Sequence, residues 1–94
     1  MSAAAADRLV RIEQRLRAAL HPEQLQVLDD SAAHAGHAGA AGGKGHFRVR
    51  IVSDRFAGLS TLQRHRLVNE AFGELWDSDL HAVSITALTS SEMR

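Results

Sequence analysis

Histidines are the residues of this 94-residue chain whose type and spacing are best suited to chemistry. His34 and His37 stand three residues apart in a stretch rich in alanine and glycine, and His81 begins a later apolar run. Neutral imidazole is the commonest metal-binding side chain and suits iron, zinc and copper. A stable site usually needs three or four protein ligands, so these histidines alone predict an incomplete or weak metal site. The alternative interpretation makes His81 an ordinary polar residue at the edge of a strand.

A basic cluster is the second candidate site. Arg64, His65 and Arg66 follow one another directly, and Arg55 adds a positive charge nearby in the sequence. Such a patch can contact phosphate groups or an acidic partner. A solvated helix face with His65 packed at the edge of the core explains the same residues, and their spacing alone favours this simpler interpretation.

No common catalytic motif is visible in the sequence. There is no glycine-rich phosphate loop, no nucleophile elbow and no pair of carboxylates placed for acid–base catalysis. The chain also has no cysteine, which excludes a thiol nucleophile, a disulfide and a cysteine-ligated cluster held by this chain alone. We therefore predict that the protein is not an enzyme.

The charge balance restricts the choice of partners. Eleven basic and eleven acidic residues cancel. Non-specific affinity for nucleic acid comes largely from neutralising phosphates, so this balance speaks against it as the main task, although a local basic patch remains compatible. No apolar run reaches the roughly 20 residues of a membrane span. The N-terminus lacks the pattern of a secretory signal, so we expect a cytoplasmic protein that has no membrane partner.

Hydrophobic spacing predicts the elements that must position these side chains within a single domain, residues 1–94. Ile12, Leu16 and Leu20 recur at helical spacing among arginines, which predicts an amphipathic first helix with a basic outer face. Pro22 ends this helix, because the residue before a proline is pushed out of the α region.

Two strands with a loop between them are predicted next. Residues 24–30 alternate briefly and predict a short strand. Residues 31–45, rich in alanine and glycine with two histidines, are expected to form a flexible loop, whose length suggests either function or disorder. Phe47, Val49 and Ile51 then alternate with arginines, which predicts a strand with one buried face and one basic, solvated face.

The second helix begins with a recognisable N-terminal signal. Ser60 and Gln63 have the spacing of a capping box, in which each side chain accepts a hydrogen bond from the backbone of the other residue. A buried stripe is expected from Leu67 to Leu75, and residues 77–79 are expected to break the helix. The basic cluster lies just inside its start.

The last strand completes an α-β-β-α-β order. Val83, Ile85 and Ala87 should share one face of it, and strand alternation places His81 on the same side, at the rim. The second helix is a right-handed crossover, so the second and third strands should be parallel, whereas the first two pair as an antiparallel hairpin. We predict an α+β fold whose helices cover one face of a three-stranded mixed sheet.

The chain resembles the BolA family in the segments HFRVRIVSDRFAGLSTLQRHRLVNEAFGEL and LHAVSITALT. The strand, the SDRFAG turn, the RHR helix start and the final-strand histidine occur in the family's order and spacing. The likeness extends over nearly the whole chain. It implies a fold related to the type II KH domain, in the element order predicted above.

The resemblance also implies a partner and a cofactor. The partner is a monothiol glutaredoxin of the CGFS type, and the two proteins share a [2Fe-2S] cluster that the glutaredoxin cysteine and a glutathione thiol also ligate. The family's invariant ligand falls on His81, and its loop ligand falls on His34 or His37, between which the choice stays open. Because the loop has no cysteine, the chain resembles the histidine-type branch. Two histidines suffice for such a shared cluster. No cofactor is expected to bind tightly to this chain alone.

DNA binding is the alternative function that the resemblance implies, because some BolA proteins are described as transcriptional regulators. The candidate surface is Arg55 with the cluster Arg64, His65 and Arg66, and the same surface could instead dock the glutaredoxin. Because the basic and acidic charges balance, we rank DNA binding as the second function. A small interaction module without any metal is a third possibility, and the chain on its own is expected to be a monomer or a weak homodimer.

Overall fold

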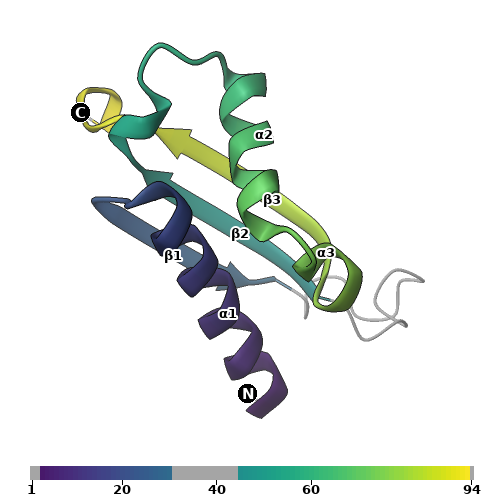
Figure 1. Ribbon diagram of the computed structural model, residues 1–94. Coiled ribbons are helices and arrows are strands. Elements are labelled where there is room, and N and C mark those ends of the chain that lie inside the picture. The colour runs from purple at the N-terminus through teal and green to yellow at the C-terminus, as the bar shows by residue number, and fades with distance from the viewer. Residues whose placement is uncertain (1–2, 31–44, 94) are drawn as a thin grey trace.

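Three strands form a single sheet, and helices cover one of its faces (Figure 1). The computed structural model describes residues 3–30 and 45–93. The elements are α1 (Ala3–Leu20), β1 (Gln24–Asp29), β2 (Gly45–Val52), η3 (Asp54–Phe56), α2 (Thr61–Phe72), α3 (Leu75–Ser78), β3 (Leu80–Leu88) and η4 (Ser90–Met93). In the order β1-β2-β3, β1 pairs with β2 antiparallel and β2 pairs with β3 parallel. The predicted α+β fold and mixed sheet are confirmed.

Helix α1 packs its apolar stripe on the sheet and ends where its sequence predicts. Ile12, Leu16 and Leu20 recur every four residues and are buried. His21 then adopts a φ of 43°, in the left-handed region where many helices terminate. Pro22 follows and excludes a helical continuation.

Among the described residues, no helix is both long and apolar enough to cross a membrane.

Helix α2 has the predicted capping box. The Ser60 hydroxyl accepts the backbone N–H of Gln63 at 3.2 Å, and the Gln63 side chain accepts the backbone N–H of Ser60 at 2.9 Å. Two of the N–H groups at the helix start thereby gain partners that the helix itself cannot supply.

The end of α2 differs from the prediction. The helix ends at Phe72 rather than at residues 77–79, because Gly73 adopts a φ of 52°, a conformation that favours glycine. A separate short helix, α3, follows, and Leu75 reaches the core from there. The buried stripe expected on one helix is therefore divided between two.

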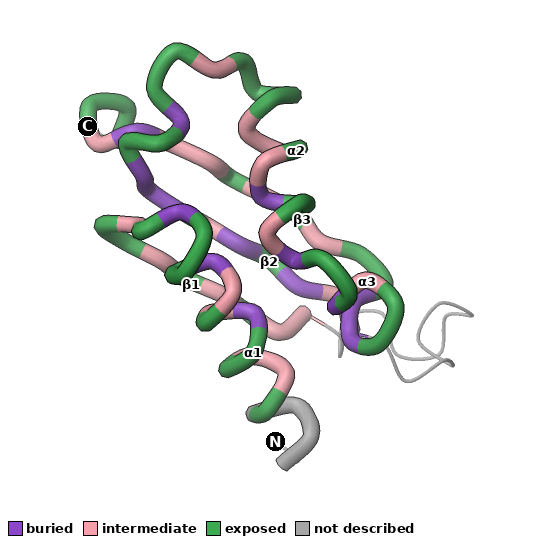
Figure 2. Tube along the Cα trace, in the orientation of Figure 1, coloured by how far each residue is buried: buried purple, intermediate pink, exposed green. Residues whose placement is uncertain are grey.

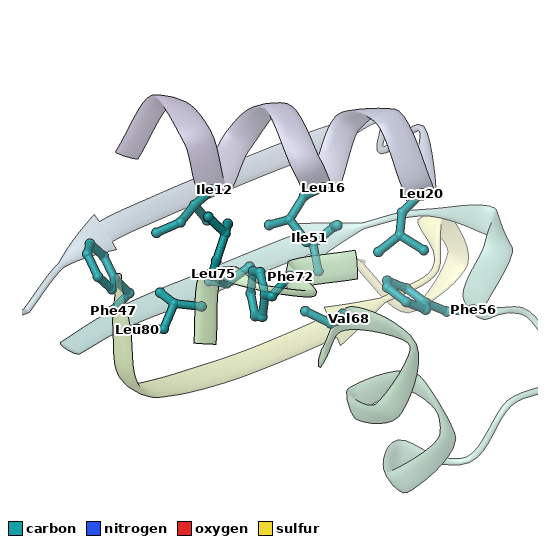
Figure 3. Packing of buried hydrophobic residues seen from close by; sticks show 11 residues of the cluster. Ile12, Leu16, Leu20, Phe47, Ile51, Phe56, Val68, Phe72, Leu75 and Leu80 are labelled. Carbon is teal, nitrogen blue, oxygen red and sulfur yellow. The ribbon is translucent and has the colours of Figure 1, made fainter. Parts of the chain in front are cut away.

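The core lies between the helices and the sheet (Figure 3). All three phenylalanines, Phe47, Phe56 and Phe72, are buried in it, and full burial of one such side chain contributes about 1.5–3 kcal/mol. Figure 2 shows burial running along the central strand β2, where Phe47, Val49 and Ile51 face inward as predicted. The outer face of β2 carries the arginines between them.

A β-bulge interrupts the start of β3. Gly45 pairs with Leu80, but the next residue of β2, His46, pairs with Ala82, so His81 is the extra residue. Leu80 is buried, whereas His81 is exposed. The unbroken alternation that underlies the prediction for His81 is therefore absent, because Leu80 occupies the inward position at this end of β3. The exposure of His81 agrees with its predicted place at the rim.

A buried carboxylate, Asp79, connects α1 to the start of β3. It accepts hydrogen bonds from Arg8 Nε at 3.3 Å, from Arg11 Nε and Nη2 at 3.2 and 2.7 Å, and from the Ser78 hydroxyl at 3.0 Å. The hydrogen bonds from Arg11 are the main reason that the pKa of Asp79 is lowered, although burial opposes this. Its backbone carbonyl also accepts the N–H of Gly45 at 2.8 Å, so one residue joins α1, β2 and β3.

We expect Asp79→Asn to lower the free energy of unfolding by about 2–3 kcal/mol at pH 7, because the two arginines lose a charged acceptor. Urea unfolding followed by far-UV circular dichroism measures this change. Asp77→Asn, on the exposed side of α3, is the matched control and should change stability by less than about 0.5 kcal/mol. Equal stability of the Asp79 variant and the parent would contradict the assigned role.

The same carboxylate should make stability depend on pH in the acid range. Because folding lowers the pKa of Asp79, its contribution is fully present above the ordinary value of 3.8 and is lost as the pH falls through the folded-state pKa. The difference in unfolding free energy between parent and Asp79→Asn should therefore shrink at acid pH, which urea titrations over a pH series would measure.

Candidate metal-ligand end and basic patch

His81 lies beside His46 of the central strand, a neighbour that the sequence does not single out. The two ring centroids are 4.9 Å apart, and the ring planes make an angle of 50°. His81 is exposed, while the Nε2 atom of His46 is buried. The contact depends on the parallel pairing of β2 with β3 and on the bulge, and neither the register nor the bulge has a signal in the sequence.

The loop histidines His34 and His37 lie outside the described residues. The ends of the loop are described: β1 ends at Asp29 and β2 begins at Gly45, one residue earlier than the predicted loop boundary. The strand register places both of these residues at the end of the sheet that carries His81. The loop therefore begins and ends at the His81 end of the sheet.

A metal ion held by three or four protein ligands at this end would need ligands beyond the described side chains. In residues 3–30 and 45–93, no group of three or more histidine, cysteine, aspartate or glutamate side chains could hold a metal ion. The nearby carboxylate of Asp79 is already held by two arginines. A second carboxylate at this end, that of Asp30, is paired with Arg48, and the Asp30 backbone N–H donates to the carbonyl of His46 at 2.7 Å.

Arg64, from the predicted basic patch, is bound inside the molecule. Its Nε donates to the carbonyl of Leu59 at 3.0 Å, and its Nη1 donates to the carbonyl of Ala87 at 3.1 Å. Its Nη1 and Nη2 also donate to the two carboxylate oxygens of Glu92 at 2.5 and 3.1 Å. Only 13% of the side chain is exposed. Arg64 therefore fastens the start of α2 to the end of β3 and to η4.

Glu92 completes this arrangement. Its carboxylate also accepts the backbone N–H of Thr89 at 2.8 Å. The pKa of Glu92 is lowered to about 2, mainly by the hydrogen bonds from Arg64. The hydrogen bond from the Thr89 backbone lowers this pKa further. The short C-terminal helix η4 is held by this bidentate pair.

The other members of the patch are placed differently. Arg55 in η3 and Arg66 in α2 are exposed, and His65 is half-buried. Arg55 follows the end of β2, whereas His81 lies against its start, so the two candidate sites are at opposite ends of the sheet. The eight residues of β2 separate them by about 23 Å.

The sheet face away from the helices is open and basic, as predicted for β2. It contains a shallow groove of about 300 Å³, lined by Gln26, Leu28, Arg48, Val49, Arg50, Ser84 and Thr86. Arg48 pairs with Asp30 at 3.1 Å, and this pair is largely solvated. Exposed pairs of this kind are weak, so the guanidinium can exchange partners.

The model of one protein family, described as "BolA-like protein", matches residues 16–92. The chain belongs to the BolA-like family. Mouse "BolA-like protein 1" is 46% identical over 93 residues, which are 99% of this chain and 66% of the mouse protein. The "DNA-binding transcriptional regulator BolA" of Escherichia coli K12 is 40% identical over 82 residues, covering 87% of this chain and 75% of that protein.

Solved structures of BolA-like domains share the fold. The BolA domain of SufE1 from Arabidopsis thaliana superposes with a TM-score of 0.78 at 44% identity, covering 88% of this chain and 92% of that one. The solution structure of mouse BolA1 gives a TM-score of 0.75 at 45% identity, covering 93% and 68% of the respective chains. The suspected family and its fold are thereby confirmed.

Other relatives place BolA-like domains in longer proteins and in organelles. This chain covers 24% of Arabidopsis "SufE-like protein 1, chloroplastic/mitochondrial", to which it is 46% identical over 89 residues. The cytoplasmic location expected from the sequence therefore stays a prediction.

We expect Arg64→Ala to raise the pKa of Glu92 from about 2 toward its ordinary 4.5, because the main hydrogen-bond donor is removed. In the parent, the pKa of Glu92 is lowered by folding, so the Arg64–Glu92 pair contributes its full stabilisation above pH 4.5. This contribution is lost as the pH falls through about 2. Carbon-13 NMR of the glutamate carboxyl during an acid titration measures the midpoint. Arg66→Ala is the control, and an unmoved midpoint in Arg64→Ala would refute the assignment.

Proposed function

We propose that this BolA-like protein is a non-catalytic adaptor that binds a monothiol CGFS glutaredoxin. The two proteins would share a glutathione-ligated [2Fe-2S] cluster for trafficking or sensing. The observation that carries the proposal is the exposed His81 at the end of the sheet where the histidine loop begins and ends. Membership of the BolA-like family supports it.

The available donors fit a shared cluster. The chain has no cysteine, so its own ligands would be imidazole nitrogens: His81 together with His34 or His37. Thiolates from the glutaredoxin and from glutathione would supply the remaining positions. Histidine in place of thiolate raises the reduction potential of such a cluster, as in Rieske centres. Because imidazole must be neutral to bind, protonation would release the cluster.

The fold explains how His81 can be presented to a partner. The bulge keeps this side chain outside the core, while its neighbour Leu80 is anchored inside. Asp79, two residues before His81, is tied to α1 by Arg8 and Arg11. The backbone at the start of β3 is therefore fixed, and the histidine is offered from a rigid element, which favours ligation.

The test is reconstitution of the cluster with the glutaredoxin and glutathione. We expect His81→Ala to alter the visible circular-dichroism spectrum and to shorten the lifetime of the cluster, because one nitrogen ligand is removed. His21→Asn is the matched control: it removes an exposed imidazole from the end of α1, and asparagine tolerates the left-handed φ. An unchanged spectrum and lifetime in His81→Ala would rule out His81 as a ligand. Separate His34→Ala and His37→Ala variants identify the loop ligand.

DNA-binding transcriptional regulation is the second candidate. Two observations favour it: the name of the Escherichia coli relative, and two exposed arginines, Arg55 after the end of β2 opposite His81 and Arg66 in α2. Arg64 contributes less, because its guanidinium is engaged by backbone carbonyls and by Glu92. The balance of eleven basic and eleven acidic residues ranks this function second.

If the protein binds DNA in this way, Arg66→Ala should weaken binding and flatten its salt dependence. Each lost phosphate contact reduces the slope of log K against log salt by about 0.9. Fluorescence anisotropy with a labelled promoter duplex at several salt concentrations measures both effects. Arg48→Ala, which removes the same charge from the open sheet face, is the control. Equal effects of the two variants, or none from Arg66→Ala, would exclude this surface.

A further inference from the structure

We infer that His46 and His81 together form a binding site for one divalent transition-metal ion, such as Zn²⁺, in the protein without any partner. The inference uses neither a glutaredoxin nor a cluster nor the loop histidines, so it goes beyond the proposed function. It rests on the contact between the two rings, which come from adjacent parallel strands.

The separation of the rings fits two ligands on one ion. An imidazole nitrogen lies about 2.0–2.1 Å from Zn²⁺, which places the centre of its ring about 3.2 Å from the metal. Two such rings have centroids about 4.5 Å apart at a right angle and about 5.2 Å apart at the tetrahedral angle. The observed separation of 4.9 Å falls between these values. The distance between the ring centroids is thus compatible with two imidazoles on one ion.

The backbone on both sides of the pair is fixed. Gly45, next to His46, donates its N–H to the carbonyl of Asp79 at 2.8 Å. Leu80, next to His81, is anchored in the core. The bulge inserts His81 opposite this part of β2, and such bulges commonly redirect a side chain. The two imidazoles are thus held together before a ligand arrives, which lowers the entropic cost of binding.

The remaining coordination positions would be open. The Asp79 carboxylate is nearby in the sequence, but its oxygens accept hydrogen bonds from Arg8, Arg11 and Ser78. Within the two described ranges, no third metal-binding side chain joins the pair. Water would complete the coordination sphere, as at zinc sites that keep an exchangeable position. Such a site favours a borderline ion that accepts nitrogen, and exposure of His81 gives the ion a route in.

Ring packing is the competing explanation for the same contact, because aromatic rings commonly pack with centroids 4.5–7 Å apart. The deciding experiment is a Zn²⁺ titration of the isolated protein at pH 7.5, followed by long-range ¹H–¹⁵N NMR of the histidine rings and by calorimetry. We expect the resonances of His46 and His81 to shift together, with saturation at one ion per chain. Shifts in neither ring, with no heat of binding, would mean that the contact is packing alone.

Variants separate this site from the loop and from the proposed cluster. His46→Ala and His81→Ala should each weaken Zn²⁺ binding about tenfold or more, since even loss of a residue that only supports a ligand costs 10–100-fold. The double variant His34→Ala/His37→Ala and the control His21→Asn should keep the parent affinity. Loss of binding in the loop variant with full binding in His46→Ala would overturn the inference.

His46→Ala also distinguishes the two proposals at this end of the sheet. The proposed cluster uses His81 and a loop histidine but not His46. Failure of cluster reconstitution therefore leaves the result of the Zn²⁺ titration unaffected. Likewise, absence of Zn²⁺ binding leaves the result of the reconstitution unaffected. Far-UV circular dichroism must show that His46→Ala is folded. Should it not fold, His46→Gln, which keeps a polar side chain of similar length, replaces it with the same expected loss of affinity.

Discussion

The fold depends on the compensation of one buried negative charge. A carboxylate out of water costs several kcal/mol unless opposite charges and hydrogen bonds compensate for it, and Asp79 obtains both from Arg8 and Arg11 of α1. The two arginines are three residues apart and so lie on one side of that helix. Satisfying Asp79 therefore fixes how α1 lies over the start of β3. The apolar stripe of α1 supplies most of the burial, but the carboxylate selects its position along the sheet.

The sequence predicted the features that are encoded locally. The stripe of α1, the proline that ends it, the capping box at Ser60 and the alternation in β2 each depend on residues a few positions apart, and each is confirmed. The parallel pairing of β2 with β3 also follows from a general rule, because a helical crossover joins them. These patterns suffice for the fold class and for the order of the strands.

Features that depend on distant partners could not be predicted from the sequence. Nothing near Arg64 in the sequence reveals that Ala87 and Glu92 bind its guanidinium, so the sequence predicts only an exposed basic residue. The sequence does not reveal that α2 ends at Gly73, because glycine can also occur inside a helix. Only the φ of 52° at Gly73 shows that the helix ends there. For the candidate site, residue type singles out His81 and the family resemblance suggests its role as a cluster ligand, whereas its contact with His46 follows from the sheet register.

The bulge at the start of β3 separates the requirements of the site from those of the fold. Side chains alternate along a strand, so the removal of one residue there would restore regular pairing without an obvious loss of core packing. The shortened chain could keep its sheet and helices while it no longer presented an imidazole to solvent. Among homologous chains, the length of this segment is consequently as informative as the identity of its residues. A single-residue deletion there would mark a lineage that retains the scaffold without the exposed imidazole.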